Sequence, residues 1–388
     1  ADGEIVPIYG GLRAVGRIGG MDYGLLSMQT ASHGGRSSEN MSVARLNQQI
    51  LNPYSSIGAM VTSRHASAGE DNLAYGVDAV LRPLGDEWLT LRWAQSFDEA
   101  IDERSAASAG LLQARWERVR DGGFTYSGEF NRVGDDYLPR LGFQSRTGFR
   151  YFGGHAQYKR FQNTTSALRS TGVQVNSGHY IRMLDGTADS RWIEGQLNVE
   201  LKNGRQLQFT GRSNFEGVLE DFDVAGAIVP AGEYWFHDAR VSLELARSAN
   251  VRGNYALTAG SFYDGTRMGL SFSPAWNPSR YLELGGGYDV NRLTFDERDQ
   301  QVTAHLARIK VQLALNTHIF FSTFAQYSNV ADLATFNARF RYHFREGTDL
   351  WLVYNEGLHT ERDIVGQPRL PRSSGRTFML KYTHTFIW

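Results

Sequence analysis

The stretch that decides the fold is "LATFNARFRYHFRE", residues 333–346. Apolar and aromatic side chains occupy its even positions: Ala334, Phe336, Ala338, Phe340, Tyr342 and Phe344. Polar and basic side chains occupy its odd positions: Thr335, Asn337, Arg339, Arg341, His343 and Arg345. A helix would scatter both sets around its circumference, whereas a strand places each set on its own face. The stretch therefore predicts a β-strand with one ring-rich face and one basic face.

The same period of two recurs along the chain, for example in 191–202, 204–217, 235–246 and 265–276. It also continues to the C-terminus in "RTFMLKYTHTFIW" (376–388), where His384 falls on the ring-rich face. The alternating segments run for about 9–15 residues. Strands of soluble proteins average about 5–6 residues, while membrane-spanning strands need about 9–11. The length of the segments therefore favours strands that cross a membrane.

The connections between these segments alternate between short and long. Short turns rich in Asn, Gly and Pro are expected at 52–55, 120–123, 202–205, 277–280, 315–318 and 345–349. Longer polar loops are expected at 32–39, 65–72, 133–146, 217–233, 294–300 and 359–374. Outer-membrane barrels have short periplasmic turns and longer extracellular loops. We therefore predict an all-β fold, a transmembrane antiparallel β-barrel of about 20–22 strands, formed by residues 1–388 as a single domain.

The composition of the chain excludes several classes of function and partner. The chain has 40 basic and 41 acidic residues, a net charge of −1, so nucleic acid is not an expected partner. It has no cysteine, which excludes disulfides and thiolate chemistry. No apolar run is long enough for a transmembrane helix. The predicted location is the outer membrane of a Gram-negative bacterium. The predicted partners are its lipid and lipopolysaccharide, with the barrel-assembly machinery reading the terminal aromatic residue.

The polar faces supply the candidate site. If the apolar faces meet lipid, the polar faces line a channel. The predicted channel-lining residues are Arg339, Arg341, His343, Arg345, Arg308, Lys310, Arg212, Asp238, Arg240, Glu244 and Glu194. Such a mixed-charge wall suits a water-filled pore, although charges that merely pair with one another explain the same pattern. Rings near strand ends predict an interfacial aromatic girdle: Trp276, Tyr281, Tyr327, Trp351, Phe386 and Trp388.

Other chemistry finds little support. The loop around Glu216, Glu220, Asp221 and Asp223 groups carboxylates that suit Ca²⁺, but its spacing matches no EF-hand, and a solvated acidic loop is the preferred interpretation. No nucleophile elbow, His-Glu-x-x-His helix or phosphate loop is found. We therefore predict no catalytic residue, no metal, no cofactor and no enzymatic activity.

Four stretches carry a family resemblance: "VPIYGGLRAVGRIGGMDYGLLSMQT" (6–30), "NMSVARLNQQILNPYSSIGAMVTSR" (40–64), "LWLVYNEG" (350–357) and "KYTHTF" (381–386). Together they resemble a family of bacterial proteins of uncharacterised function. Its members pair an N-terminal domain resembling family-9 carbohydrate-binding modules with a C-terminal outer-membrane barrel. The resemblance covers this chain as the barrel part. It implies a periplasmic binding domain or other subunits as partners.

The predicted function is a pore or channel for small polar solutes. Saccharides are named among those solutes through the family resemblance alone. The alternative is a non-conducting outer-membrane scaffold or receptor within a larger assembly. A membrane-embedded hydrolase and a soluble all-β protein are the further alternatives.

Overall fold

The computed structural model describes residues 6–67, 69–101, 105–363, 366 and 368–385. Its strands are antiparallel neighbours along the chain. Hydrogen bonding assigns 21 of them to long sheet strands and the remaining two, β13 and β14, to a separate hairpin. The sheet strands are 9 to 15 residues long, as the alternation predicts. No helix in the described part of the chain is long and apolar enough to cross a membrane.

The chain divides into two compact units. Unit 1 comprises residues 1–159 and 174–193, and unit 2 comprises residues 160–173 and 194–388. The boundary runs through β9, β10 and β11 instead of falling in a linker. The expectation of one domain stays a prediction.

Unit 1 is an antiparallel meander in which each strand from β1 to β9 pairs with the next. Its strands are β1 (Ile8–Ile18), β2 (Met21–Thr30), β3 (Glu39–Gln49), β4 (Ser56–Ala66), β5 (Asn72–Leu81), β6 (Glu87–Asp98), β7 (Gly110–Arg118), β8 (Gly123–Val133) and β9 (Phe149–Phe161). Residues of both units contribute to β10 (Leu168–Arg182) and β11 (Ala188–Leu201).

Unit 2 continues in the same manner, with each long strand from β12 to β23 pairing with the next. Its strands are β12 (Gln206–Val218), β13 (Phe222–Val224), β14 (Ala227–Val229), β15 (Gly232–Glu244), β16 (Val251–Phe262), β17 (Gly265–Ser279), β18 (Leu282–Phe295), β19 (Gln300–Ala314), β20 (Ile319–Ser328), β21 (Leu333–Arg345), β22 (Thr348–His359) and β23 (Ser373–His384). A short 3₁₀ helix, η1 (Asp296–Arg298), joins β18 to β19.

The connections follow the predicted alternation of short turns and longer loops in part. The longer loop predicted at 294–300 is instead a short connection, 296–299, between β18 and β19. Strands β7 and β8, and β21 and β22, are joined by short turns, while β2 and β3, β8 and β9, and β12 and β15 are joined by longer loops. Glycine marks two of the short turns. Gly204 has φ 82° and Gly347 has φ 75°, a left-handed conformation that side chains with a Cβ disfavour. A Cβ at Gly347 would also lie 2.7 Å from the Cβ of Thr385.

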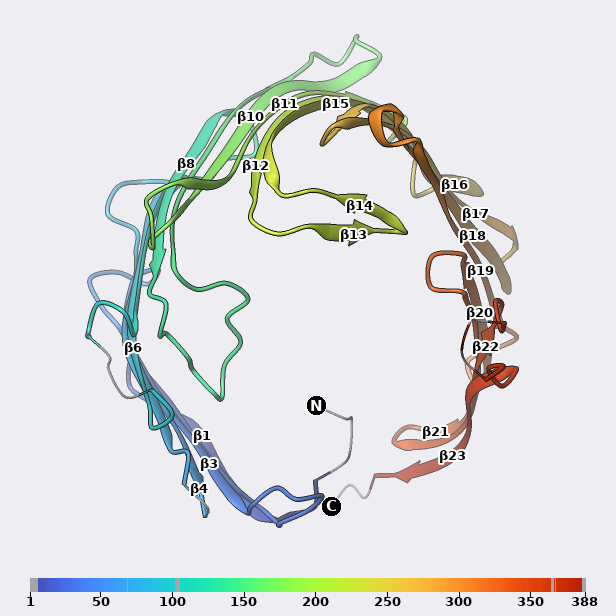
Figure 1. Cartoon of the computed structure of the whole chain (residues 1–388). Coiled ribbons are helices and arrows are strands. Elements are labelled where there is room, and N and C mark those ends of the chain that lie inside the picture. The colour runs from blue at the N-terminus through green and yellow to red at the C-terminus, as the bar shows by residue number, and fades with distance from the viewer. Residues whose placement is uncertain (1–5, 68, 102–104, 364–365, 367, 386–388) are drawn as a thin grey trace. The chain divides into compact units, whose positions relative to one another are not determined.

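The small buried cores lie where connecting segments fold against a sheet. In unit 1, Val133, Tyr137 and Phe149 are buried together at the ends of the 134–148 segment. In unit 2, the β13–β14 hairpin buries Ala227 and Val229 against Leu293 and Phe295. Figure 1 shows both segments leaving the wall formed by the strands of their own unit. Both of these long connections are thus packed structures.

Candidate functional site

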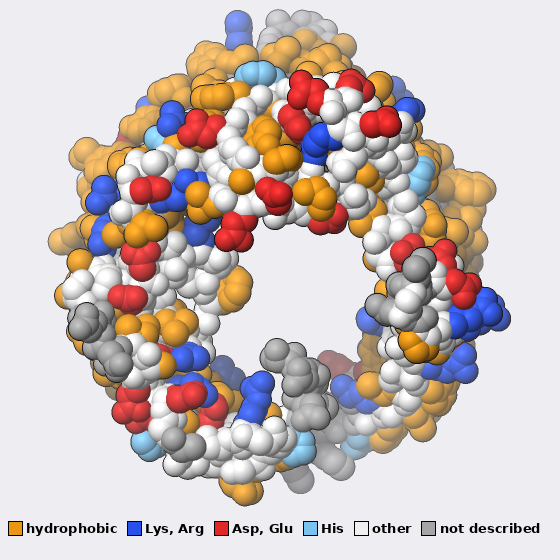
Figure 2. Space-filling view, viewed as in Figure 1, with side chains coloured by type: hydrophobic (Ala, Val, Ile, Leu, Met, Phe, Trp, Pro, Cys, Tyr) orange, Lys and Arg blue, Asp and Glu red, His pale blue; other side chains and the backbone are white. Residues whose placement is uncertain are grey.

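The sheet of unit 2 has a predominantly apolar face. Because paired residues share a face, the register aligns Leu313, Phe321, Phe340, Leu352 and Leu380 in one row across β19–β23. Large apolar side chains on this face are well exposed in the isolated chain, including Leu257 (62%), Ile309 (61%) and Met268 (68%). Figure 2 shows hydrophobic side chains gathered along one side of β16–β19. An exposed apolar band of this extent is typical of a surface covered by lipid.

The opposite face carries charged residues that are paired across strands. Arg308 on β19 forms an ion pair with Asp289 on β18, and Ser271 on β17 donates a hydrogen bond to the same carboxylate. Lys310 Nζ lies 3.3 Å from Glu283 Oε1, and Arg252 contacts the other oxygen of Glu283. Two of the predicted channel-lining residues, Arg308 and Lys310, therefore lie on the polar face and take part in charge-paired clusters.

A second network occupies the polar face of β11, β12 and β15. The Arg212 Nε donates to Glu194 Oε2 at 3.0 Å, and the Gln196 amide donates to Glu194 Oε1 at 2.5 Å. Asp238 lies directly opposite Arg212 in the register. Arg240 donates to the Thr258 hydroxyl at 3.3 Å, and Glu244 pairs with Arg247 at the end of β15. All five predicted residues of this group share the polar face or its edge.

Arg341 is the most constrained residue of the predicted basic ladder on β21. Its Nε donates to Asp349 Oδ1 at 2.7 Å, and His343 Nδ1 lies 2.9 Å from the same oxygen. The Arg341 guanidinium also lies 5.1 Å from the ring centroid of Trp351, which is a cation–π distance. Trp351 pairs directly with Arg341 in the register. The interpretation of Trp351 as a girdle residue is therefore wrong, since its ring lies on the charged face.

The two remaining residues of the ladder differ from each other. Arg339 lies opposite Ser322 and Val353 on the polar face and is exposed. Arg345 follows a register shift and pairs with Thr348, whose row on β23 contains His384 of the apolar face. The shift breaks the alternation, so the prediction that Arg345 shares the face of Arg339 is wrong.

The other predicted girdle residues lie in three kinds of place. Trp276 pairs with Leu284 and Tyr327 with Ala334, so both rings belong to the apolar face near strand ends. Tyr281 lies in the short β17–β18 turn beneath the Arg280 guanidinium. Phe386 and Trp388 lie outside the described residues. His384, as predicted, lies on the apolar face, where its Nδ1 is 2.9 Å from the Thr348 hydroxyl.

The polar face of unit 1 also carries paired charges. Arg45 forms a two-pronged pair with Asp78, in which one Nη–Oδ distance is 2.8 Å. Arg115 Nη1 lies 3.3 Å from Glu129 Oε2, and Gln113 donates to Glu129 Oε1 at 2.9 Å. The alternation signal is weaker here because small apolar residues such as Ala74, Gly76 and Ala94 occupy the same face.

The 134–148 segment is anchored on this face by polar contacts. Arg140 Nε and Nη2 donate to the buried Asp98 carboxylate at 2.7 and 3.1 Å. The Leu138 N–H donates to the Ser96 hydroxyl at 2.9 Å, and the Asn72 amide donates to the Leu138 carbonyl at 2.8 Å. Burial raises the pKa of the Tyr137 hydroxyl. These contacts hold the segment against the polar face of β5 and β6.

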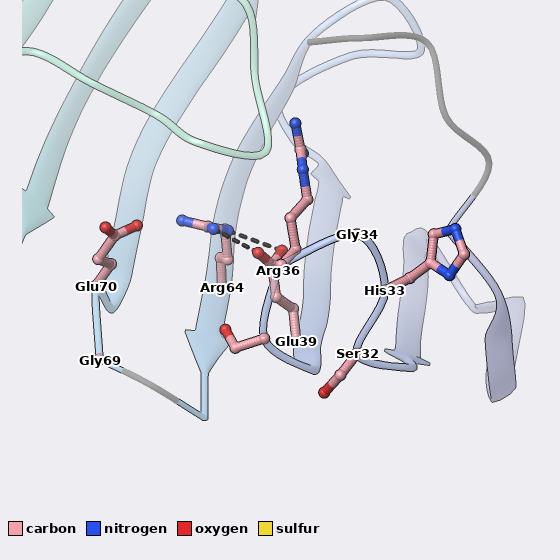
Figure 3. A pocket seen from close by; sticks show the side chains of 10 residues that line it. Ser32, His33, Gly34, Arg36, Glu39, Arg64, Gly69 and Glu70 are labelled. Carbon is pink, nitrogen blue, oxygen red and sulfur yellow. Dashed lines mark hydrogen bonds and ion pairs between the residues drawn. The ribbon is translucent and has the colours of Figure 1, made fainter.

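A cavity of about 560 Å³ remains between this segment and the strands. Arg45, Asp78 and Arg92 line it from the sheet, and Tyr137 and Phe143 line it from the segment. A larger hollow of about 810 Å³ lies between the β2–β3 and β4–β5 loops. Figure 3 shows the Arg64–Glu39 ion pair at its base, with the Arg36 side chain extending away from that pair. Both cavities combine charged groups with open access to solvent.

Among the connections, Asp86 and Tyr263 have shifted pKa values. In the β5–β6 turn, hydrogen bonds from Arg120 and Arg118 help to lower the pKa of Asp86 to about 2. In the β16–β17 turn, burial raises the pKa of Tyr263, and a hydrogen bond to Glu216 raises it further. The Tyr263 hydroxyl is therefore a permanent donor that ties the β16–β17 turn to β12. Among the described residues, no group of three or more His, Asp or Glu side chains is arranged to hold a metal ion.

A meander of long antiparallel strands with one apolar and one charged face belongs to the class of transmembrane antiparallel β-barrels, which confirms the predicted fold. The siderophore receptor PirA from Pseudomonas aeruginosa is similar over 95% of this chain and 80% of its own, with 10% identity and a TM-score of 0.50. The copper transporter OprC is similar over 93% of this chain and 68% of its own, with 10% identity and a TM-score of 0.44. PirA from Acinetobacter baumannii covers 93% of this chain and 72% of its own, with 8% identity and a TM-score of 0.45.

The likeness to the first of these proteins concerns the fold, because so few residues are identical. No protein-family model matches the chain. A search of curated proteins also finds no match. The residues of the site must therefore be interpreted from their own chemistry.

Proposed function

We propose that this chain is a bacterial outer-membrane β-barrel whose polar face lines a path for small polar solutes. The observation that carries the proposal is the separation of the two faces in the middle of β19–β23, where Phe321, Phe340 and Leu380 share one face and Arg339, Arg341 and Lys381 share the other. The charged pair on the apolar face, Glu356 and Arg376, lies toward the ends of β22 and β23. Charged side chains facing hydrocarbon would cost several kcal/mol each near the midplane. The apolar row therefore belongs against lipid and the charged row against water.

The fold likeness to the siderophore receptor PirA from Pseudomonas aeruginosa supports this proposal. The paired charges suit passage of hydrated solutes, because fixed donors and acceptors replace part of a solute's hydration shell without trapping it. Saccharides remain proposed solutes through the family resemblance alone. A periplasmic binding domain, other subunits, lipopolysaccharide and the barrel-assembly machinery remain proposed partners.

One observation favours the alternative, a non-conducting receptor or scaffold. The β13–β14 hairpin and the 134–148 segment both pack on the polar face of their own units, held by the Ala227–Val229 core and the Asp98–Arg140 pair. Segments fixed in this way reduce the space open to a solute.

Single-channel recording in planar lipid bilayers separates the two functions. The detergent-folded protein is expected to insert and to give discrete, ohmic current steps. Folding is checked beforehand by circular dichroism, which should show β structure. A protein that is folded and inserted into the bilayer but carries no current would contradict the channel and leave the receptor or scaffold.

A further inference from the structure

The polar face of β19–β23 carries more positive than negative charge. The cations that the register places on it are Arg308, Lys310, Arg339, Arg341 and Lys381. On these five strands the described residues place one carboxylate on the same face, that of Asp349. The excess of positive charge is therefore a property of this part of the sheet.

Neighbouring carboxylates neutralise three of the five cations. Asp349 pairs with Arg341, while Asp289 and Glu283 of β18 pair with Arg308 and Lys310. Within the described part of the chain, Arg339 and Lys381 form no ion pair, and both residues are exposed. Two positive charges on this face are thus available to a ligand.

The register brings these charges close together. Arg341, Trp351 and Lys381 form one row across β21, β22 and β23, so their Cα atoms span about 10 Å at the usual strand spacing. Arg339 lies in the adjacent row, opposite Val353. Asp349 and the Trp351 ring hold the Arg341 guanidinium in place. We call this group, Arg339, Arg341 and Lys381 around Trp351, the basic strip.

We infer that the basic strip binds solutes that carry carboxylate or phosphate groups. Guanidinium groups bind such oxyanions with two parallel hydrogen bonds, and ammonium groups bind them as point charges. A ligand with two or more anionic groups can contact Arg339 and Lys381 together. The inference rests on the proposed function, since it names the class of solute that the polar face takes.

Calorimetric titration of the detergent-folded protein tests the inference with two probes, inorganic pyrophosphate and citrate. We expect both to bind at low salt and to be displaced in about 1 M salt, where the Debye length falls to about 3 Å. The paired substitution Arg339→Gln with Lys381→Gln should weaken binding at least about tenfold. The matched control is Lys202→Gln with Arg205→Gln, which removes the same two residue types from the exposed β11–β12 turn. It should leave binding unchanged.

The two probes distinguish phosphate from carboxylate ligands, because a phosphate site would favour pyrophosphate and a carboxylate site citrate. Absence of binding for both probes, or binding unaffected by the strip substitutions in a folded protein, would overturn the inference. Bilayer recording of the same samples separates this outcome from failure of the proposed function. A silent protein that binds the probes contradicts the channel but retains the strip. A conducting protein that binds neither probe retains the channel without the strip.

Discussion

The polar face of unit 1 and the basic strip of unit 2 carry similar residue types in different arrangements. In unit 1, Arg45 is matched by Asp78, Arg115 by Glu129 and Arg140 by Asp98. In the basic strip, Arg339 and Lys381 have no such match among the described residues. Paired charges satisfy one another and hold strands and segments together, whereas unmatched charges leave their hydrogen-bonding capacity for a ligand. The difference separates residues that serve the fold from residues available for function.

The segments that cover the two units also differ. The 134–148 segment is fixed mainly through polar contacts to Asp98, Asn72 and Ser96. The β13–β14 hairpin is fixed through an apolar core in which Ala227 and Val229 are fully buried. The polar attachment depends on few hydrogen bonds, while the apolar one depends on buried area. Substitutions should therefore release the two segments in different ways.

The largest effect is expected from Val229→Asp in unit 2. A carboxylate without a partner in the apolar core should destabilise the hairpin by about 3 kcal/mol or more, enough to detach it. Limited proteolysis should then cut within 219–231, and conductance should rise. Ile228→Asp is the matched control, because Ile228 is its neighbour on the exposed side of the same strand. Equal protease sensitivity in both variants would show that the apolar core does not hold the hairpin.

In unit 1, Asp98→Ala should release the 134–148 segment at a cost of about 2 kcal/mol. Removal of the carboxylate leaves the partly buried Arg140 guanidinium without its ion-pair partner and removes one hydrogen bond from the Asn72 amide. Urea unfolding and proteolysis within 134–148 measure the change. Asp121→Asn, in the exposed turn before β8, should match the wild type. A protected segment in the Asp98 variant would mean that its other contacts suffice.

The contrast between paired and unpaired charges is tested by measuring the free energy of unfolding. A double-mutant cycle of Arg45→Gln and Asp78→Asn should give a coupling of about 1 kcal/mol, because both groups are partly exposed. Arg339→Gln should change the free energy of unfolding by less than about 0.5 kcal/mol. A large loss from Arg339→Gln would reveal a structural partner and weaken its assignment to the basic strip.

The smallest effect concerns acid stability at the β5–β6 turn. The lowered pKa of Asp86 means that its ionised form stabilises the fold at pH above its unfolded pKa of about 4. This contribution should be lost as the pH falls through the folded pKa of about 2. Asp86→Asn should therefore flatten the stability profile between those values while leaving the rest unchanged. An identical profile for variant and wild type in acid unfolding would contradict the role of Arg120 and Arg118.

The strands and their connections were predictable because their signals are local. Period-two alternation marks a two-faced strand, and turn residues such as Asn203 and Gly204 mark its end. The partners of the charged residues were not predictable. The Arg308–Asp289 pair depends on the register between β18 and β19, which neither strand encodes alone. The packing of the 134–148 segment depends on Asp98, about 40 residues away in the chain.

The misplaced residues have equally specific causes. Residues 350–354 are all apolar, so alternation cannot tell which face Trp351 takes. The pairing with Arg341 decides it. Arg345 was misplaced because the register shift after His343 removes the parity on which the prediction depended. Alternation therefore cannot assign the face of a residue where all neighbours are apolar or where a register shift interrupts the pairing.

Single-cysteine labelling on β21 tests most directly the claim that one face of the sheet meets lipid and the other meets water. The sequence contains no cysteine, so each introduced cysteine is its only thiol. In lipid vesicles, a membrane-impermeant charged thiol reagent should modify Thr335→Cys and Arg339→Cys but spare Phe336→Cys and Phe340→Cys. Fluorophores attached at the latter two positions before reconstitution should be quenched by brominated lipid. Equal labelling at all four positions, or labelling confined to positions 336 and 340, would contradict an apolar face in lipid and a charged face in water.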